Sequence, residues 1–163
     1  MNGKSATILL VLGFAWAMAA KAQTPPAIAV RITDAVKAKE PTWQWVSAIQ
    51  SGRVPVVPSE KTILVGSWNA DGQRSIAHIA VYEVGNLEDA KMWLRGVREG
   101  RVYPGWHVAP YAIGDEGFVS TYEPNGQAEI QFRSANFVVS IGGADLASVQ
   151  RVAAYVLPEI APR

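Results

Sequence analysis

The stretch GFVSTYEPNGQAEIQFR, residues 117–133, decides the fold class that the sequence predicts. Two runs rich in β-forming residues flank a Pro-Asn-Gly turn at 124–126, and this pattern is typical of a β-hairpin. In the second run Ala128, Ile130 and Phe132 share one face, and the residues between them are polar. Such alternation places one face of a strand against a core and the other toward solvent. We therefore expect an antiparallel sheet around this hairpin.

Further strands are predicted on both sides of the hairpin. Residues 137–141 follow it after a short turn, and residues 106–112 precede it. Upstream, residues 62–68 and 74–84 form two more strands, joined by an Asn-Ala-Asp-Gly turn at 69–72. The run 74–84 is largely apolar on both faces, which predicts a strand in the interior of the sheet.

Three amphipathic helices are predicted between and around these strands. In the first, apolar residues recur at every fourth position from Ile28, and Pro41 ends it. The second begins at Asn86, a good N-cap residue, and ends in a basic turn. The third begins at Asp145, and Pro158 is expected to end its regular part.

The order of these elements, α-ββ-α-ββββ-α, predicts an α+β fold. We expect an antiparallel sheet of about five to six strands with helices packed on one face. The turns at 68–73 and 122–127 both combine an aromatic residue with Gly-Gln, and each leads through a strand to a helix. This similarity also permits a duplicated ββα plan.

The first 22 residues have the order of features found in a secretory signal peptide. A positive residue, Lys4, precedes an apolar run at 6–20, and Ala20-Lys21-Ala22 is a small-x-small cleavage site. An uncleaved anchor is the alternative, but the run is shorter than the roughly 20 apolar residues that cross a bilayer. We predict cleavage before Gln23, and membrane contact only through the signal peptide before it is cleaved.

The domain organisation follows from this prediction. Residues 1–22 are the signal peptide, and residues 23–163 form a single α+β domain. Within it, residues 23–60 form an N-terminal helix and a loop rich in proline and tryptophan, and residues 61–163 form the sheet and two helices. The mature chain is expected in the periplasm or outside the cell.

Composition excludes several classes of function. The sequence has no cysteine, which rules out disulfides, thiolate metal sites and a lipid-modified cysteine. Without the two lysines of the leader, the chain carries 13 basic and 14 acidic residues. Such a balance provides no electrostatic footprint for nucleic acid, so no nucleic-acid partner is expected.

Residues suited to catalysis are few. His107 precedes Asp115 and Glu116 by eight and nine positions, and a histidine near a carboxylate can act as an acid/base pair. His78 lies in an apolar strand face, where a structural role is the expected one. The sequence contains no nucleophile-elbow motif, phosphate-binding loop or metal-ligand spacing. We expect no cofactor and no metal.

Aromatic residues in loops and edge regions are the remaining feature. Trp43, Trp45, Trp106 and Tyr111 are candidates for a ligand groove or a protein-contact patch. In the alternative interpretation, the tryptophans of the 41–60 loop cover an open face of the sheet. The favoured hypothesis is a non-catalytic binding or interaction module, whose partner is an unknown protein or small ligand in the cell envelope. The second hypothesis is a small hydrolase or lyase that uses His107 with Asp115 or Glu116.

One local pattern resembles a known group of proteins. Gly114-Asp115-Glu116-Gly117, then FRSANFVV at 132–139, then a helix, is similar to a GDE(A/G)…FRxxNxVV…helix pattern. This pattern recurs in small exported or lipid-anchored bacterial proteins of unassigned function. The resemblance covers roughly residues 108–156 and implies an antiparallel α+β domain outside the cytoplasm. It implies no catalytic residues, and the cysteine that anchors some of these proteins is absent here.

Overall fold

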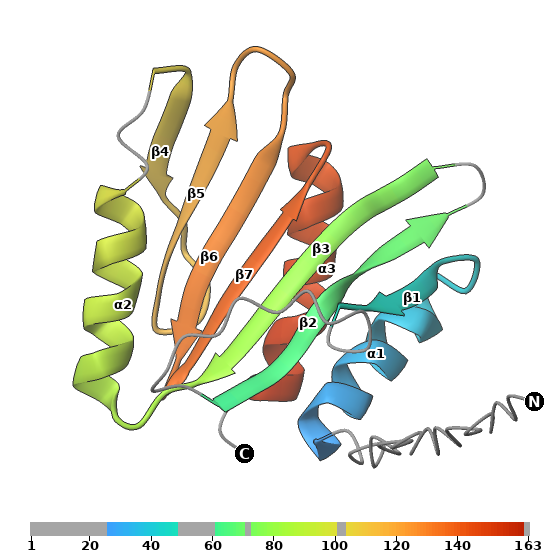
Figure 1. The fold of residues 1–163 in the computed structure, drawn as a ribbon, viewed down its shortest axis with the longest axis horizontal. Coiled ribbons are helices and arrows are strands. Elements are labelled where there is room, and N and C mark those ends of the chain that lie inside the picture. Colours follow the sequence, from blue (N-terminus) through green and yellow to red (C-terminus); the bar gives the residue numbers. More distant parts are fainter. Residues whose placement is uncertain (1–25, 49–60, 71–72, 101–103, 162–163) are drawn as a thin grey trace, which may run out of the picture.

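The computed structural model describes residues 26–48, 61–70, 73–100 and 104–161 (Figure 1). The predicted signal peptide, residues 1–22, and most of the predicted loop at 41–60 lie outside these described residues. The described chain forms a seven-stranded sheet and three helices.

The sheet is antiparallel throughout, with the strand order β1-β2-β3-β7-β6-β5-β4. The strands are β1 (Gln44–Ser47), β2 (Lys61–Ala70), β3 (Gln73–Glu83), β4 (Trp106–Pro110), β5 (Glu116–Tyr122), β6 (Ala128–Ser134) and β7 (Phe137–Gly143). The predicted α+β class is confirmed, with seven strands in place of five to six. β3 pairs with both β2 and β7, as expected for an interior strand.

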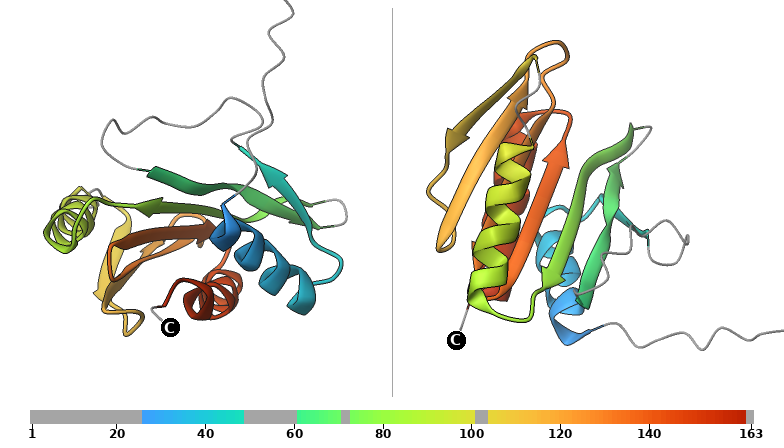
Figure 2. Two further views of the ribbon diagram at one scale, coloured as in Figure 1. Left: turned by 90° about the horizontal axis from the view of Figure 1, so that it is seen from below. Right: turned by 60° about the vertical axis from the view of Figure 1, so that its left-hand side comes forward.

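Two helices, α1 (Ala27–Lys39) and α3 (Leu146–Ile160), pack on one face of the sheet, which we call the inner face. Their apolar stripes join Ile79, Val139 and other strand residues in the main core cluster. Long-range packing of apolar side chains, rather than helix propensity, is what stabilises helices of this length. The sheet curls around these two helices (Figure 2).

The third helix, α2 (Leu87–Glu99), lies against the opposite face, which we call the outer face. It forms a second small cluster with Val84 and Val138, and Val138 neighbours the inner-face residue Val139. Because successive strand residues point to opposite faces, these two clusters lie on opposite sides of the sheet. The predicted duplication would relate two ββα units, β2-β3-α2 and β6-β7-α3, which are adjacent because β3 pairs with β7. A two-fold axis perpendicular to the sheet would place both helices on the same face, whereas α2 and α3 lie on opposite faces.

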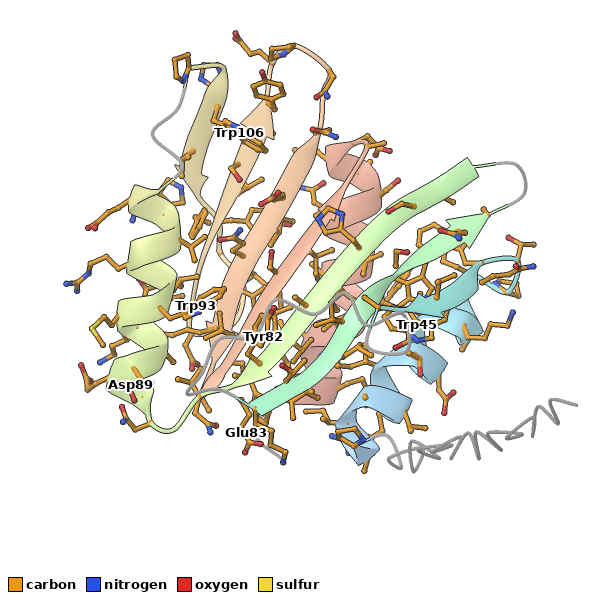
Figure 3. All side chains as sticks on the ribbon, viewed as in Figure 1. Trp45, Tyr82, Glu83, Asp89, Trp93 and Trp106 are labelled. Carbon is orange, nitrogen blue, oxygen red and sulfur yellow. The ribbon has the colours of Figure 1, made fainter. Side chains whose placement is uncertain are left out.

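The middle of the sheet is therefore buried on both sides. Every residue of β6 except Glu129 is buried, since α3 covers its inner face and α2 its outer face (Figure 2). Tyr82 of β3 contacts Trp93 of α2 with ring centroids 5.9 Å apart, which marks the edge of the area that α2 covers (Figure 3).

Local predictions were right at the starts of α2 and α3 and wrong at two other places. The side chains of Asn86 and Asp145 accept hydrogen bonds from the N–H groups of Asp89 and Ser148, as N-caps do. The predicted loop at 41–60 contains a strand, β1, which pairs with β2. α3 continues past Pro158, because its last residue, Ile160, is buried in the core and packing there outweighs one lost hydrogen bond.

Candidate functional site

The histidine proposed for catalysis lies apart from the carboxylates with which it was expected to act. His107 is in the edge strand β4, and its Nε2 lies 3.0 Å from Oε1 of Glu123, both side chains being more than 60% exposed. It pairs in register with Thr121, and Glu116 lies five residues earlier in β5. At about 3.3 Å per residue, this separates His107 and Glu116 by about 16 Å along the strand.

The two carboxylates instead hold a buried arginine. Arg133 Nη1 lies 3.1 Å from Asp115 Oδ2, and its Nε lies 3.2 Å from Glu116 Oε2. The Arg133 side chain is only 11% exposed, and a buried charge is tolerated when it is paired. Asp115 also accepts a hydrogen bond from the backbone N–H of Ala135. Both carboxylates therefore have structural partners at the start of β5.

The aromatic residues proposed for binding divide between the two edges of the sheet. Trp45 is in β1 and Trp106 is in β4 (Figure 3). Trp43 directly precedes β1. Six strand spacings of about 4.8 Å separate these edges by about 29 Å. Trp106 packs on Tyr122 with centroids 5.2 Å apart, and Tyr111 is partly buried against the core. The four residues do not form one continuous surface.

At the β1 edge, the tryptophans differ in exposure. Trp43 is 6% exposed and Trp68 is 1% exposed, and both belong to the main core cluster. Trp45 is half-buried; its ring centroid is 4.7 Å from that of Trp68, with the planes tilted by 54°. Such tilted pairs are favourable beyond the area that they bury. The interpretation that tryptophans of this segment pack against the sheet agrees with the placement of Trp43.

A glycine makes room for the Trp45 ring. A Cβ atom at Gly66 of β2 would lie 2.5 Å from Cζ2 and Cη2 of Trp45, and it would also overlap the backbone oxygen of Val46. Any side chain at this position would displace the ring and the edge strand together. The position of Trp45 is thus determined by Gly66 on one side and by Trp68 on the other.

A hollow of about 290 Å³ opens between this ring and α1. We call it the tryptophan hollow; besides Trp43 it is lined by Thr33, Asp34, Lys37, Gln44, Trp45 and Trp68.

Two of the polar residues at the hollow already have partners, and two do not. Lys37 Nζ donates to the backbone oxygen of Pro41 at 2.7 Å, and Thr33 Oγ1 donates to that of Val30 at 2.9 Å. Within the described part of the chain, the carboxylate of Asp34 and the amide of Gln44 have no hydrogen bond or ion pair. The hollow thus combines a fixed aromatic ring with two polar groups that have no partner in the described ranges.

A second hollow, of about 430 Å³, lies on the outer face over β1, β2 and β3. His78 lines it and is exposed, although the apolar strand face around it led us to expect a structural role. The imidazole lies over Gly142 of β7, where a Cβ atom would overlap it, and Ser67 pairs with His78 on the other side. The ring leans away from Ser67, so the two are not arranged as a nucleophile and its base.

The sequence analysis named Trp45 as a candidate but did not name the residues that surround it in the hollow. Asp34 and Lys37 belong to a predicted helix whose polar side gives no signal of function, and Gly66 resembles any small strand residue. Among the described residues, no group of three or more His, Asp or Glu side chains is arranged to hold a metal ion. No helix in the described ranges is both long and apolar enough to cross a bilayer.

Comparison with known proteins gives one structural likeness. No family model and no curated protein matches the chain. The extracellular domain of PknH from Mycobacterium tuberculosis superposes with a TM-score of 0.47 at 13% identity, over 83% of this chain and 97% of that domain. A likeness at this level carries no argument about function.

Proposed function

We propose that the mature chain is an exported, non-catalytic binding module and that its ligand binds in the tryptophan hollow. The observation that carries this proposal is the fixed ring of Trp45 beside the carboxylate of Asp34, which has no partner among the described residues. Small-molecule sites combine apolar and aromatic walls with a few polar groups, and they are largely formed before the ligand arrives. The partner is a small ligand or protein group of the cell envelope.

Export is the part of the proposal that rests on the leader sequence. The order of Lys4, the apolar run and Ala20-Lys21-Ala22 supports cleavage before Gln23. Expression with the native leader, followed by mass spectrometry of the exported protein, tests this. A mature chain that begins at Gln23 is expected, and exported material that retains Met1 would contradict it.

The hydrolase or lyase alternative finds little support in the geometry. His107 pairs with Glu123, and both candidate carboxylates hold Arg133. A general base must lie within hydrogen-bond reach of its partner or of one shared water. The separation of about 16 Å along the strand between His107 and Glu116 is too long for such a contact.

The binding proposal is tested by NMR of the tryptophan indole N–H groups in the mature protein. A soluble extract of the cell envelope should shift the signal of Trp45, and Trp106, at the opposite edge, should not respond. The variant Trp45→Phe, which keeps an apolar ring but loses the indole N–H and part of the surface, should bind more weakly when followed through Trp43 and Trp68. Shifts confined to Trp106, or no shifts at all, would contradict the proposed site.

A further inference from the structure

We infer that the tryptophan hollow binds an uncharged, polyhydroxylated ring of the sugar type; this inference rests on the proposed function. A sugar ring has C–H groups on its faces and hydroxyl groups around its edge. Trp45 provides a flat apolar surface for such a face, since it is held on Trp68 and lines the hollow with the part left uncovered. The polar residues from α1 stand beside it, where the hydroxyl groups would lie.

Within the described residues, the hydrogen-bonding capacity left at the hollow includes acceptors on Asp34 and Thr33 and, on the Gln44 amide, both donors and an acceptor. The Asp34 carboxylate accepts through two oxygens and donates nothing when ionised. The Thr33 hydroxyl uses its proton on a backbone oxygen of α1, at 2.9 Å from Val30, and retains lone pairs. A ligand that satisfies this set must bring several groups that can both donate and accept on a compact body. Sugar hydroxyl groups fit this requirement, and ethers, ketones and hydrocarbons do not.

The charges at the hollow favour a neutral ligand over an ion. Asp34 and Lys37 are three residues apart on α1, so both lie on the same side of the helix and their charges cancel. A cation would be attracted by the Asp34 carboxylate and the Trp45 ring but repelled by Lys37. An anion would be attracted by Lys37 but repelled by the Asp34 carboxylate and the face of the Trp45 ring.

The size of the hollow limits how much of a ligand it can cover. Its volume of about 290 Å³ lies just below the range of small-molecule pockets, which begins at about 300 Å³. One ring can be seated there, and the rest of a longer saccharide would continue past β1, which is the last strand on this side of the described sheet.

The test is a titration of the mature protein, residues 23–163, with glucose, N-acetylglucosamine and cellobiose, followed by NMR of the indole N–H signals. Choline chloride and inorganic phosphate serve as the cationic and anionic probes. At least one neutral sugar should shift Trp45. Asp34→Asn, an exposed and nearly isosteric change, should weaken that binding about tenfold because it removes a charged acceptor. Glu99→Gln on α2, also exposed, is the matched control and should leave the affinity unchanged.

The outcomes separate this inference from the function on which it rests. If choline shifts Trp45 and no sugar does so up to about 50 mM, the site binds cations, and the sugar inference is overturned while the binding proposal stands. Equal binding by wild type and Asp34→Asn would also overturn it, because the carboxylate would then take no part. If neither the sugars nor the envelope extract shift Trp45, both the inference and the proposed function fail.

Discussion

The two edges of the sheet have similar aromatic pairs in different surroundings. At one edge Trp45 of β1 packs on Trp68, and at the other Trp106 of β4 packs on Tyr122. Beside Trp45 lies the free carboxylate of Asp34, whereas the charged groups near β4 are paired with one another. An aromatic pair at a sheet edge therefore does not by itself support a proposed binding site. What distinguishes the β1 edge is the presence of polar groups without partners in the described chain.

The largest expected difference between the edges is in stability. Trp43→Ala removes a side chain that is 6% exposed in the core beside β1, and such truncations cost about 3 to 5 kcal/mol of unfolding free energy. Trp106→Ala removes a half-buried ring from an edge strand and should cost about 1 to 2 kcal/mol, in the range of typical single substitutions. Urea denaturation of the two variants measures both values. Equal losses of unfolding free energy in the two variants would show that both tryptophans contribute equally to the stability of the fold.

The next effect concerns the glycines that accompany each aromatic pair. A Cβ atom at Gly66 would overlap the Trp45 ring, and one at Gly105, whose φ is +88°, would lie 2.8 Å from Tyr122 Cε2. Gly66→Ala should cost about 1 to 3 kcal/mol through overpacking, and it should also move the indole signal of Trp45. Gly105→Ala should cost about 1 kcal/mol through its backbone conformation and leave Trp45 unchanged. A Trp45 signal that stays in place in Gly66→Ala would mean that the ring is not fixed as described.

The N-cap of α3, Asp145, lies at neither edge of the sheet and serves as a reference for the other variants. The N–H and the hydroxyl of Ser148 both donate to Asp145, and together they hold the pKa of this N-cap carboxyl below its usual value. Because the pKa is lowered in the folded state, the stabilisation is complete above about pH 3.9 and is lost as the pH falls further. Asp145→Ala should cost about 1 kcal/mol at pH 7, and thermal melts should show the difference from wild type shrinking in acid. A difference that does not change with pH would exclude the charged cap as its cause.

Sequence patterns predicted the local structure well and the assembly of the site poorly. The hairpin at 117–133 and the caps Asn86 and Asp145 were found because alternation, turn residues and capping depend on neighbours in the sequence. β1 was missed because its four residues are too few to show a pattern. The contact of Trp45 with Gly66 depends on strand pairing, and the approach of Asp34 to Trp45 depends on how α1 packs. Neither leaves a signal in the local sequence.

The smallest expected effect is at His107, and it bears on whether the β4 edge has any chemical role. The imidazole is 63% exposed, and its contact with Glu123 at 3.0 Å is a surface pair. Such pairs contribute between about 0 and 1 kcal/mol, because water screens the charges and the side chains lose freedom on pairing. His107→Ala should therefore change the midpoint of urea unfolding only slightly, by less than about 0.5 kcal/mol in free energy. Glu123→Gln is the matched control, since it keeps the shape of the partner and removes its charge, and its effect should be equally small. A loss of more than about 2 kcal/mol in His107→Ala alone would show that the imidazole has a buried, bonded role. The β4 edge would then be a second candidate functional site beside the tryptophan hollow.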